Sequence, residues 1–135
     1  MTAPAGVGDG RVAGIGVDAV DVPRFRTLLE RRPRLAGRLF SEAERSYATG
    51  TADPGARLAA RFAAKEAVWK ALGVGLGAAG FLDVEVVRGP DGAPALALAG
   101  RAAALAAARG VTRWHLSLTH TDVVAVASVL AEGGG

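Results

Sequence analysis

Apolar residues recur along the chain in short segments of two different periods, and these segments predict the order of the helices and strands. Residues 11–20, RVAGIGVDAV, alternate loosely and are rich in valine and isoleucine, which predicts a strand that ends near Asp18. Asp21 can cap a following helix, and Pro23 suits the first turn of that helix. We therefore expect a helix at about residues 22–31.

The middle of the chain is expected to be helical. A short helical turn is expected at residues 34–40, and Ser41 followed by Glu44 forms a capping-box pattern at the start of SEAERSYA. The strongest helical signal covers residues 56–72, which contain no glycine or proline and are followed by Gly73 as a stop. This long segment is the expected central helix.

The pattern changes to short strands after the central helix. GVGLGAAG at residues 73–80 is a glycine-rich connector, and residues 81–88 then alternate as a strand. Asp91 and Gly92 form a typical hairpin signal, so residues 95–99 are expected to return as the second strand of a hairpin.

The last part of the chain predicts one more helix and two more strands. Alanine-rich residues 101–109 are expected to form the helix, and residues 113–118 and 123–130 the strands, with a break at 119–122. The order of one strand, several helices, a hairpin, a helix and a strand pair predicts an α+β fold, in which the long central helix packs on an antiparallel sheet.

Length and composition fit one folded domain. The chain has 135 residues, of which 50% are hydrophobic and 21% charged, and it contains no cysteine. We expect a single domain at residues 11–131 between flexible tails at 1–10 and 132–135. The first ten residues do not resemble a signal peptide, and no apolar stretch approaches the roughly 20 residues that span a bilayer. A cytoplasmic protein without membrane contact is therefore expected.

The positive charge comes mainly from arginine. The formal net charge is +3, and the only two lysines, Lys65 and Lys70, both lie in the predicted central helix. This distribution is compatible with chance, but it also suggests that these two positions need an amine, which is a compact charge with a tunable pKa.

Glu66 and Lys70 are four residues apart and therefore share one face of the predicted helix. The ordinary interpretation is a surface ion pair. The alternative is a magnesium–phosphate site, in which the carboxylate binds the cation and the amine binds phosphate oxygen. Asp18, at the end of the first strand, is a plausible second carboxylate, although an aspartate at that place is more often a turn or cap residue.

The two histidines do not predict a zinc site. His115 and His120 are five residues apart, so they face opposite ways on a regular strand, and further ligands are missing. His115 is expected to be a packed strand residue, whereas His120 lies where the strand breaks and can reach a ligand.

Arginines are concentrated just after the first strand. They are Arg24, Arg26, Arg31, Arg32, Arg34 and Arg38, with only Glu30 opposing them. Such a run is usually a solvated face, but it also suits docking of an acidic surface. Nucleic acid is less favoured, because no aromatic residues interleave with the arginines.

Three segments, taken together, resemble a known family. GIGVDAVDVPR at residues 14–24, RFAAKEAVWKALGVG at 61–75 and SLTH at 117–120 occur in this order at suitable separations. The chain resembles the holo-acyl-carrier-protein synthases, the small type of 4'-phosphopantetheinyl transferase, from about residue 12 to residue 130. The resemblance implies a phosphopantetheinyl transferase-like fold and transfer of the 4'-phosphopantetheine arm of coenzyme A to a serine of an apo acyl carrier protein.

The resemblance also implies roles for particular residues. Asp18 and Glu66 would bind Mg²⁺, and Lys70 would contact the phosphates; these three form the expected catalytic set. Lys70, Glu66 or a metal-bound water remain alternatives for deprotonating the serine. The residues expected to bind coenzyme A are Arg61, Lys65, Lys70, Gly73, Gly75 and His120.

The implied partners follow from the same resemblance. Arg24 and Arg31 would dock an acidic carrier protein, and adenosine 3',5'-bisphosphate would leave. Members of this size are typically homotrimers with active sites between subunits, and they act in lipid biosynthesis, including fatty acid biosynthesis. The alternative hypothesis is a non-catalytic basic module that binds an acidic protein or a polyanion.

Overall fold

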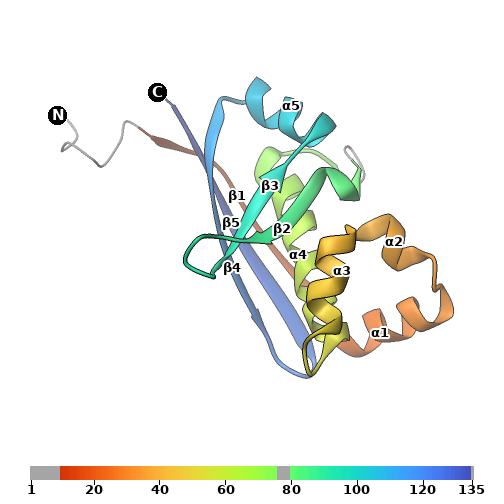
Figure 1. The fold of residues 1–135 in the computed structure, drawn as a ribbon. Helices are drawn as coiled ribbons and strands as arrows, with labels where there is room; N and C mark the ends of the chain where they lie inside the picture. The colour runs from red at the N-terminus through yellow and green to blue at the C-terminus, as the bar shows by residue number, and fades with distance from the viewer. Residues whose placement is uncertain (1–9, 76–79, 135) are drawn as a thin grey trace.

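A computed structural model describes residues 10–75 and 80–134. A three-stranded antiparallel sheet has the strand order β1–β5–β4, and a smaller sheet pairs β2 with β3 (Figure 1). Strand bounds are β1 Arg11–Asp21, β2 Val84–Arg88, β3 Pro94–Leu98, β4 Val111–His120 and β5 Val124–Gly133. Helix bounds are α1 Val22–Arg31, α2 Leu35–Leu39, α3 Glu42–Thr49, α4 Pro54–Leu72 and α5 Gly100–Ala108, with a 3-10 turn, η1, at Phe81–Asp83. The α+β prediction is confirmed.

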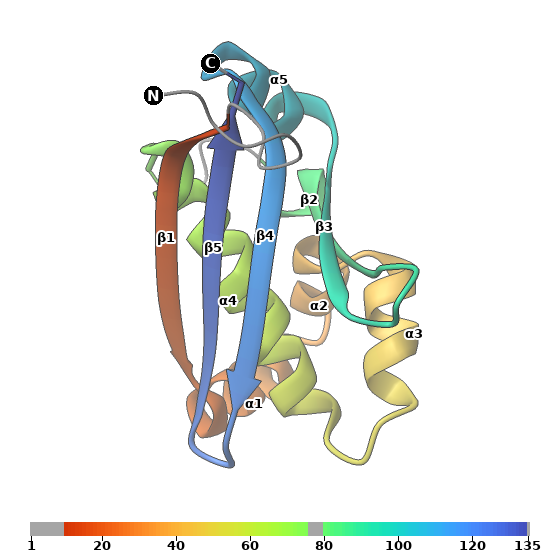
Figure 2. The same ribbon diagram turned by 90° about the vertical axis from the view of Figure 1, so that its left-hand side faces the viewer.

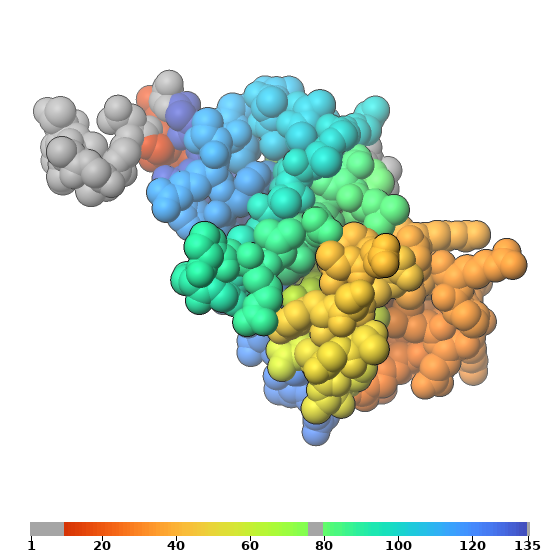
Figure 3. All heavy atoms as spheres, viewed as in Figure 1, coloured from red at the N-terminus to blue at the C-terminus, as the bar shows by residue number. Residues whose placement is uncertain are grey.

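The long helix α4 lies along one face of the large sheet, as Figure 2 shows. On its other side, α3 and the β2–β3 hairpin lie next to each other and cover much of it (Figure 3). Most residues of α4 are therefore buried, including Val68, Trp69 and Leu72. The central position of this helix is as predicted.

Two glycines of β1 explain why α4 can lie so close to the sheet. A Cβ atom on Gly14 would lie 1.9 Å from the carbonyl oxygen of Ala71, and one on Gly16 would lie 1.9 Å from that of Ala67. Only hydrogen fits at these two positions. Asp18 follows two residues later on the same strand, and it therefore faces α4 as well.

Several predicted helix boundaries are confirmed at atomic detail. The side chain of Asp21 accepts from the backbone N–H of Arg24, and α1 begins at the next residue, as expected. Ser41 and Glu44 form the expected capping box. Gly73 ends α4 with a φ of 70°, in the left-handed region that favours glycine.

Three other boundaries differ from the prediction. Residues 81–83 form the turn η1, not the start of a strand, because the amine of Lys65 binds the carbonyls of Phe81 and Val84 at either end of it. Strand β4 continues to His120, and the break falls at residues 121–123, where Thr121 closes a turn through backbone and hydroxyl hydrogen bonds. Strand β5 extends to Gly133, beyond the expected domain limit; of the expected tail at 1–10, only Gly10 is described.

The face of the large sheet opposite α4 carries exposed apolar side chains. Val12, Ile15 and Val17 are 60%, 65% and 56% exposed. None of the described helices covers this face, which is turned toward the viewer in Figure 2. Among residues 10–75 and 80–134, no helix is long and apolar enough to cross a membrane.

Candidate active site

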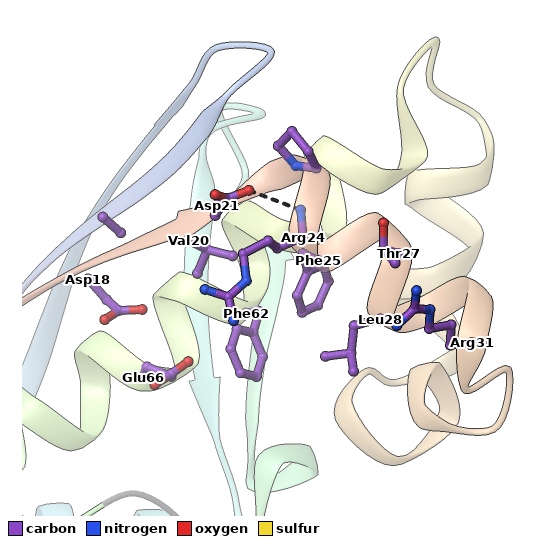
Figure 4. Close-up of a pocket in the computed structure, with 12 residues that line it drawn as sticks. Asp18, Val20, Asp21, Arg24, Phe25, Thr27, Leu28, Arg31, Phe62 and Glu66 are labelled. Carbon is purple, nitrogen blue, oxygen red and sulfur yellow. Dashed lines mark hydrogen bonds between the residues drawn. The ribbon is translucent and has the colours of Figure 1, made fainter.

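A pocket of about 710 Å³ lies where β1 ends, between α1 and the middle of α4. At one end it is lined by Asp18 and Glu66, and its walls include Phe62, Phe25 and Leu28 (Figure 4). The pocket therefore joins a carboxylate end to an apolar groove.

Asp18, Glu66 and Lys70 come together from two elements. The Nζ atom of Lys70 lies 3.0 Å from Oδ1 of Asp18 and also donates to the carbonyl of Val17 at 3.1 Å. None of the four ion pairs formed within residues 10–75 and 80–134 includes Glu66. The spacing of Glu66 and Lys70 suggested a pair between them, but the structure pairs Lys70 with Asp18 and leaves Glu66 facing the pocket.

The electrostatics at Glu66 favour a bound cation. Burial raises the pKa of Glu66 above its usual range, and the negative charge of Asp18 adds to this, while Lys70 partly opposes it. Two carboxylates at one end of a pocket are the hard oxygen ligands that Mg²⁺ takes when substrate phosphates and water complete its coordination. The described residues contain no group of three or more acidic or histidine side chains that could hold a metal alone. The pair thus fits Mg²⁺ bound together with a phosphate substrate.

Arginines from α1 line the other side of the pocket. In the view of Figure 4, Arg24 extends toward the carboxylate end, and Arg31 lies at the far end beside Leu28. Arg24, Leu28 and Arg31 are spaced by four and three residues, so they share one face of α1. That helical spacing is the signal by which Leu28 could have been found in the sequence.

Lys65 and Arg61 lie on a different side of α4, against α3. The amine of Lys65 is fully buried, and it donates to Glu44, Phe81 and Val84, which leaves none of its three donors for a phosphate. Arg61 is also buried, with its guanidinium 4.3 Å from the centre of the Tyr47 ring. Neither residue lines the pocket.

The remaining predicted coenzyme A residues lie at opposite ends of α4. Gly73 and Gly75 follow its C-terminus and are exposed, and a Cβ on either would meet nothing within 4 Å. His120 lies near the N-terminus of α4, by the cap residue Asp53. The hydrogen bond from Arg26 is the main cause that lowers the pKa of Asp53, and the charge of His120 adds to it. The structure therefore brings Asp18, Glu66 and Lys70 together, but not these residues.

The pocket's aromatic wall was missed in the sequence. Phe25, Phe62 and Phe81 form a continuous row, with ring centres 5.1 Å apart for the first pair and 5.5 Å for the second. Phe81 comes from a distant part of the chain, so no local spacing could reveal this row.

The sequence is similar to those of known proteins over most of its length. Residues 14–127 match the family model described as the 4'-phosphopantetheinyl transferase superfamily. The chain is 52% identical over 124 residues to the holo-[acyl-carrier-protein] synthase of Clavibacter sepedonicus, with 92% of this chain and 98% of the relative covered. It is 54% identical over 121 residues to that of Frankia casuarinae, with 90% and 98% covered.

Some related proteins with the same fold have been solved with a nucleotide bound. A holo-(acyl-carrier-protein) synthase from Bacillus anthracis in complex with CoA (3',5'-ADP) is 33% identical, with a TM-score of 0.74 and 91% and 98% of the two chains covered. The acyl carrier protein synthase of Plasmodium yoelii with ADP bound is 26% identical, with a TM-score of 0.84 and 95% and 100% covered.

Proposed function

The chain belongs to the 4'-phosphopantetheinyl transferase superfamily, and from this premise we propose that its transfer reaction requires Mg²⁺ and releases adenosine 3',5'-bisphosphate. It is an enzyme of the holo-[acyl-carrier-protein] synthase type, which transfers phosphopantetheine from coenzyme A to an apo acyl carrier protein. The observation that carries the proposal is the grouping of Asp18, Glu66 and Lys70 at one end of the pocket. Family membership favours this function over a non-catalytic basic module.

Asp18 from β1 and Glu66 from α4 would hold Mg²⁺ at the carboxylate end of the pocket. When bound, the ion supplies positive charge that offsets the charge building on phosphate oxygens during transfer. The unpaired state of Glu66 among the described ion pairs and its raised pKa both support this role, because a nearby cation relieves the cost of its charge. The two carboxylates would also fix where the pyrophosphate of coenzyme A lies.

Lys70 would bind a phosphate oxygen beside the metal. Its side chain is 54% exposed, and its contact with Asp18 holds the amine at the carboxylate end of the pocket. In the reaction, the serine oxygen of the carrier forms a bond to the phosphorus that bears the pantetheine arm. The bond from that phosphorus to the bridging oxygen of the pyrophosphate breaks, and this oxygen leaves with adenosine 3',5'-bisphosphate. The serine proton would pass to a base, for which Lys70 and Glu66 are the candidates from this chain. Positioned charge is the main protein contribution to such phosphoryl transfers.

The positions of the residues expected to bind coenzyme A support the proposal that the active site is shared between subunits. Gly73 and His120 lie at opposite ends of α4, and a 19-residue helix is about 28 Å long. The phosphates of one coenzyme A cannot contact both ends of one chain. We therefore propose that Gly73, Gly75 and His120 serve sites completed by a second copy, in a homotrimer.

The carrier protein would dock on α1. Arg24 and Arg31 line the pocket, and neither is in an ion pair with another described residue. An acidic carrier surface would supply the missing negative charge and bring its serine to the carboxylate end. A cytoplasmic enzyme that supplies holo carrier proteins to lipid biosynthesis, including fatty acid biosynthesis, fits this proposal.

Substitution of the two carboxylates tests the metal assignment. Asp18→Asn and Glu66→Gln should each reduce transfer by about a hundredfold or more, because each removes a metal ligand and its charge. Asp122→Asn, which removes an exposed carboxylate in the β4–β5 turn, serves as the matched control and should keep full activity. Full activity of both pocket variants would show that the metal assignment is wrong.

A further inference from the structure

The buried amine of Lys65 connects four elements of the protein. It lies 2.8 Å from Oε1 of Glu44 on α3 and 2.9 Å from the carbonyl oxygen of Phe81, and it also donates to the carbonyl of Val84. Glu44 in turn accepts from the backbone N–H groups of Ser41 and Val86. Lys65 and Glu44 together tie α4 and α3 to η1 and β2.

The segment that Lys65 holds carries Phe81. The two carbonyls that bind the amine lie at either end of η1, so the amine fixes the whole turn. The ring of Phe81 stacks on that of Phe62 with 5.5 Å between centres and an angle of 21° between planes. It also meets the ring of Trp69 edge-on at 4.6 Å.

Phe62 connects Phe81 to the pocket. Its ring is half-buried, with Phe81 on one side and Phe25 on the other, and it lines the pocket one helical turn before Glu66. The position of this wall therefore depends in part on the turn that carries Phe81.

The chemistry of the contact explains why the residue is a lysine. An ammonium group offers three donors to three separate acceptors, whereas the planar guanidinium of arginine donates in a fixed fork. A buried ion pair is often no better for stability than a well-packed apolar pair of the same size. The benefit of Lys65 and Glu44 thus lies in the geometry they fix.

We infer that Lys65 and Glu44 are positioning residues for the transfer reaction: they hold η1 so that Phe81 supports Phe62 and shapes the wall of the substrate pocket. This inference rests on the proposed function, since the pocket is the place where the carrier serine meets the metal-bound phosphate. It also gives Lys65 a role that needs an amine without any contact with coenzyme A.

A double-mutant cycle on transfer kinetics tests the inference. The variants are Glu44→Gln/Lys65→Met, Phe62→Ala and the triple combination, assayed well below the lowest melting temperature of the set. The glutamine that replaces Glu44 is not charged, and its single amide oxygen can still accept from one of the two backbone N–H groups, that of Ser41 or that of Val86. The methionine that replaces Lys65 fills the space of the lysine chain without its amine. We expect the Glu44→Gln/Lys65→Met variant to lower kcat/KM about tenfold, and the triple variant to be no less active than Phe62→Ala.

Multiplicative losses in the triple variant, or an unchanged kcat/KM in the Glu44→Gln/Lys65→Met variant, would overturn the inference. Lys65→Arg is a second test variant, because it keeps the positive charge but not the three hydrogen bonds of the amine. Its kcat/KM should also be lower than that of the wild type. Full activity of Lys65→Arg would also overturn the inference. The wild-type protein is assayed alongside: no transfer by the wild type would contradict the proposed function, whereas failure of this inference is visible only in the variants.

Discussion

At the scale of single residues, the protein places like charges together where its chemistry needs them. Asp18 and Glu66 face the same pocket, and Lys70 partly offsets their charge through its contact with Asp18. Such a grouping makes the folded protein less stable than it would be without one carboxylate. Function and stability are therefore opposed at Glu66.

Glu66→Gln should raise the melting temperature of the metal-free protein at neutral pH. The pKa of Glu66 is raised above its ordinary value of 4.5 in the fold, so the folded state binds the proton more tightly than the unfolded state. The difference in pKa therefore stabilises the folded state at low pH. This contribution of Glu66 to the free energy of unfolding is complete at pH values below the pKa of the unfolded state, and it is lost as the pH rises through the pKa of the folded state. At neutral pH the ionised carboxylate opposes folding, and glutamine removes this effect.

Thermal unfolding in the presence of a chelator, at about pH 4 and about pH 7, on either side of the ionisation of Glu66, measures this effect. The advantage of the glutamine variant should be larger at the higher pH. A variant that melts lower than the wild type at neutral pH would contradict the assigned environment of Glu66. Glu30→Gln, at an exposed position of α1, is the control for a general charge effect.

At the scale of elements, the contact between β1 and α4 builds the active site. Gly14 and Gly16 let the backbones approach, and this approach brings Asp18 within 3.0 Å of Lys70. A methyl group on either glycine would collide with backbone atoms of α4, which cannot move aside as a flexible side chain can.

Gly16→Ala should lower the free energy of unfolding by about 3 kcal/mol, because it overpacks a contact between backbones. Gly37→Ala on α2 is the matched control, since a Cβ there meets nothing within 4 Å. That control should raise the free energy of unfolding by about 0.5–1 kcal/mol, the usual gain of alanine over glycine in a helix. Urea unfolding measures both, and equal stability of the two variants would refute the close contact.

Sequence patterns predicted elements well where the governing contacts are local. The capping box of Ser41 and Glu44 spans three residues, and the stop at Gly73 depends on its own backbone angle. The turn η1 could not be predicted in this way, because Lys65, 16 residues from Phe81, holds it in place. The alternating pattern that begins at residue 81 reflects neighbouring residues only, and it therefore cannot indicate a contact with Lys65.

Contacts between distant parts of the chain also limited the prediction of the candidate site. Spacing alone favoured an ordinary ion pair between Glu66 and Lys70 and a turn or cap role for Asp18, and the resemblance to a family raised the three to a catalytic set. In the structure Asp18 lies beside Lys70, 52 residues away in sequence. The aromatic wall and the contact of Glu44 with Lys65 lie outside what either spacing or resemblance had indicated.

At the scale of the whole molecule, the described chain leaves one apolar sheet face uncovered. Ile15 and Val17 project from β1 on the side opposite α4, and both are more than half exposed. An uncovered apolar sheet face marks an interaction surface, and the proposed trimer would bury it.

Ile15→Lys should therefore convert a trimer into monomers, because it places a charge in the apolar interface. Light scattering during gel filtration measures the mass in solution. We expect three chains for the wild type and one for the variant, with transfer activity lost together with the trimer. A monomeric wild-type protein, or a variant that stays trimeric, would contradict the proposed assembly.

The most direct test of the account is the mass of an apo acyl carrier protein after incubation with the wild-type protein and coenzyme A. With Mg²⁺ present, the carrier should gain the mass of one phosphopantetheine group on its serine, with adenosine 3',5'-bisphosphate as the second product. With a chelator in place of Mg²⁺, the carrier mass should stay unchanged. Transfer that proceeds equally well in both conditions would contradict the metal role of Asp18 and Glu66, and no transfer to any acidic carrier in either condition would contradict the proposed function itself.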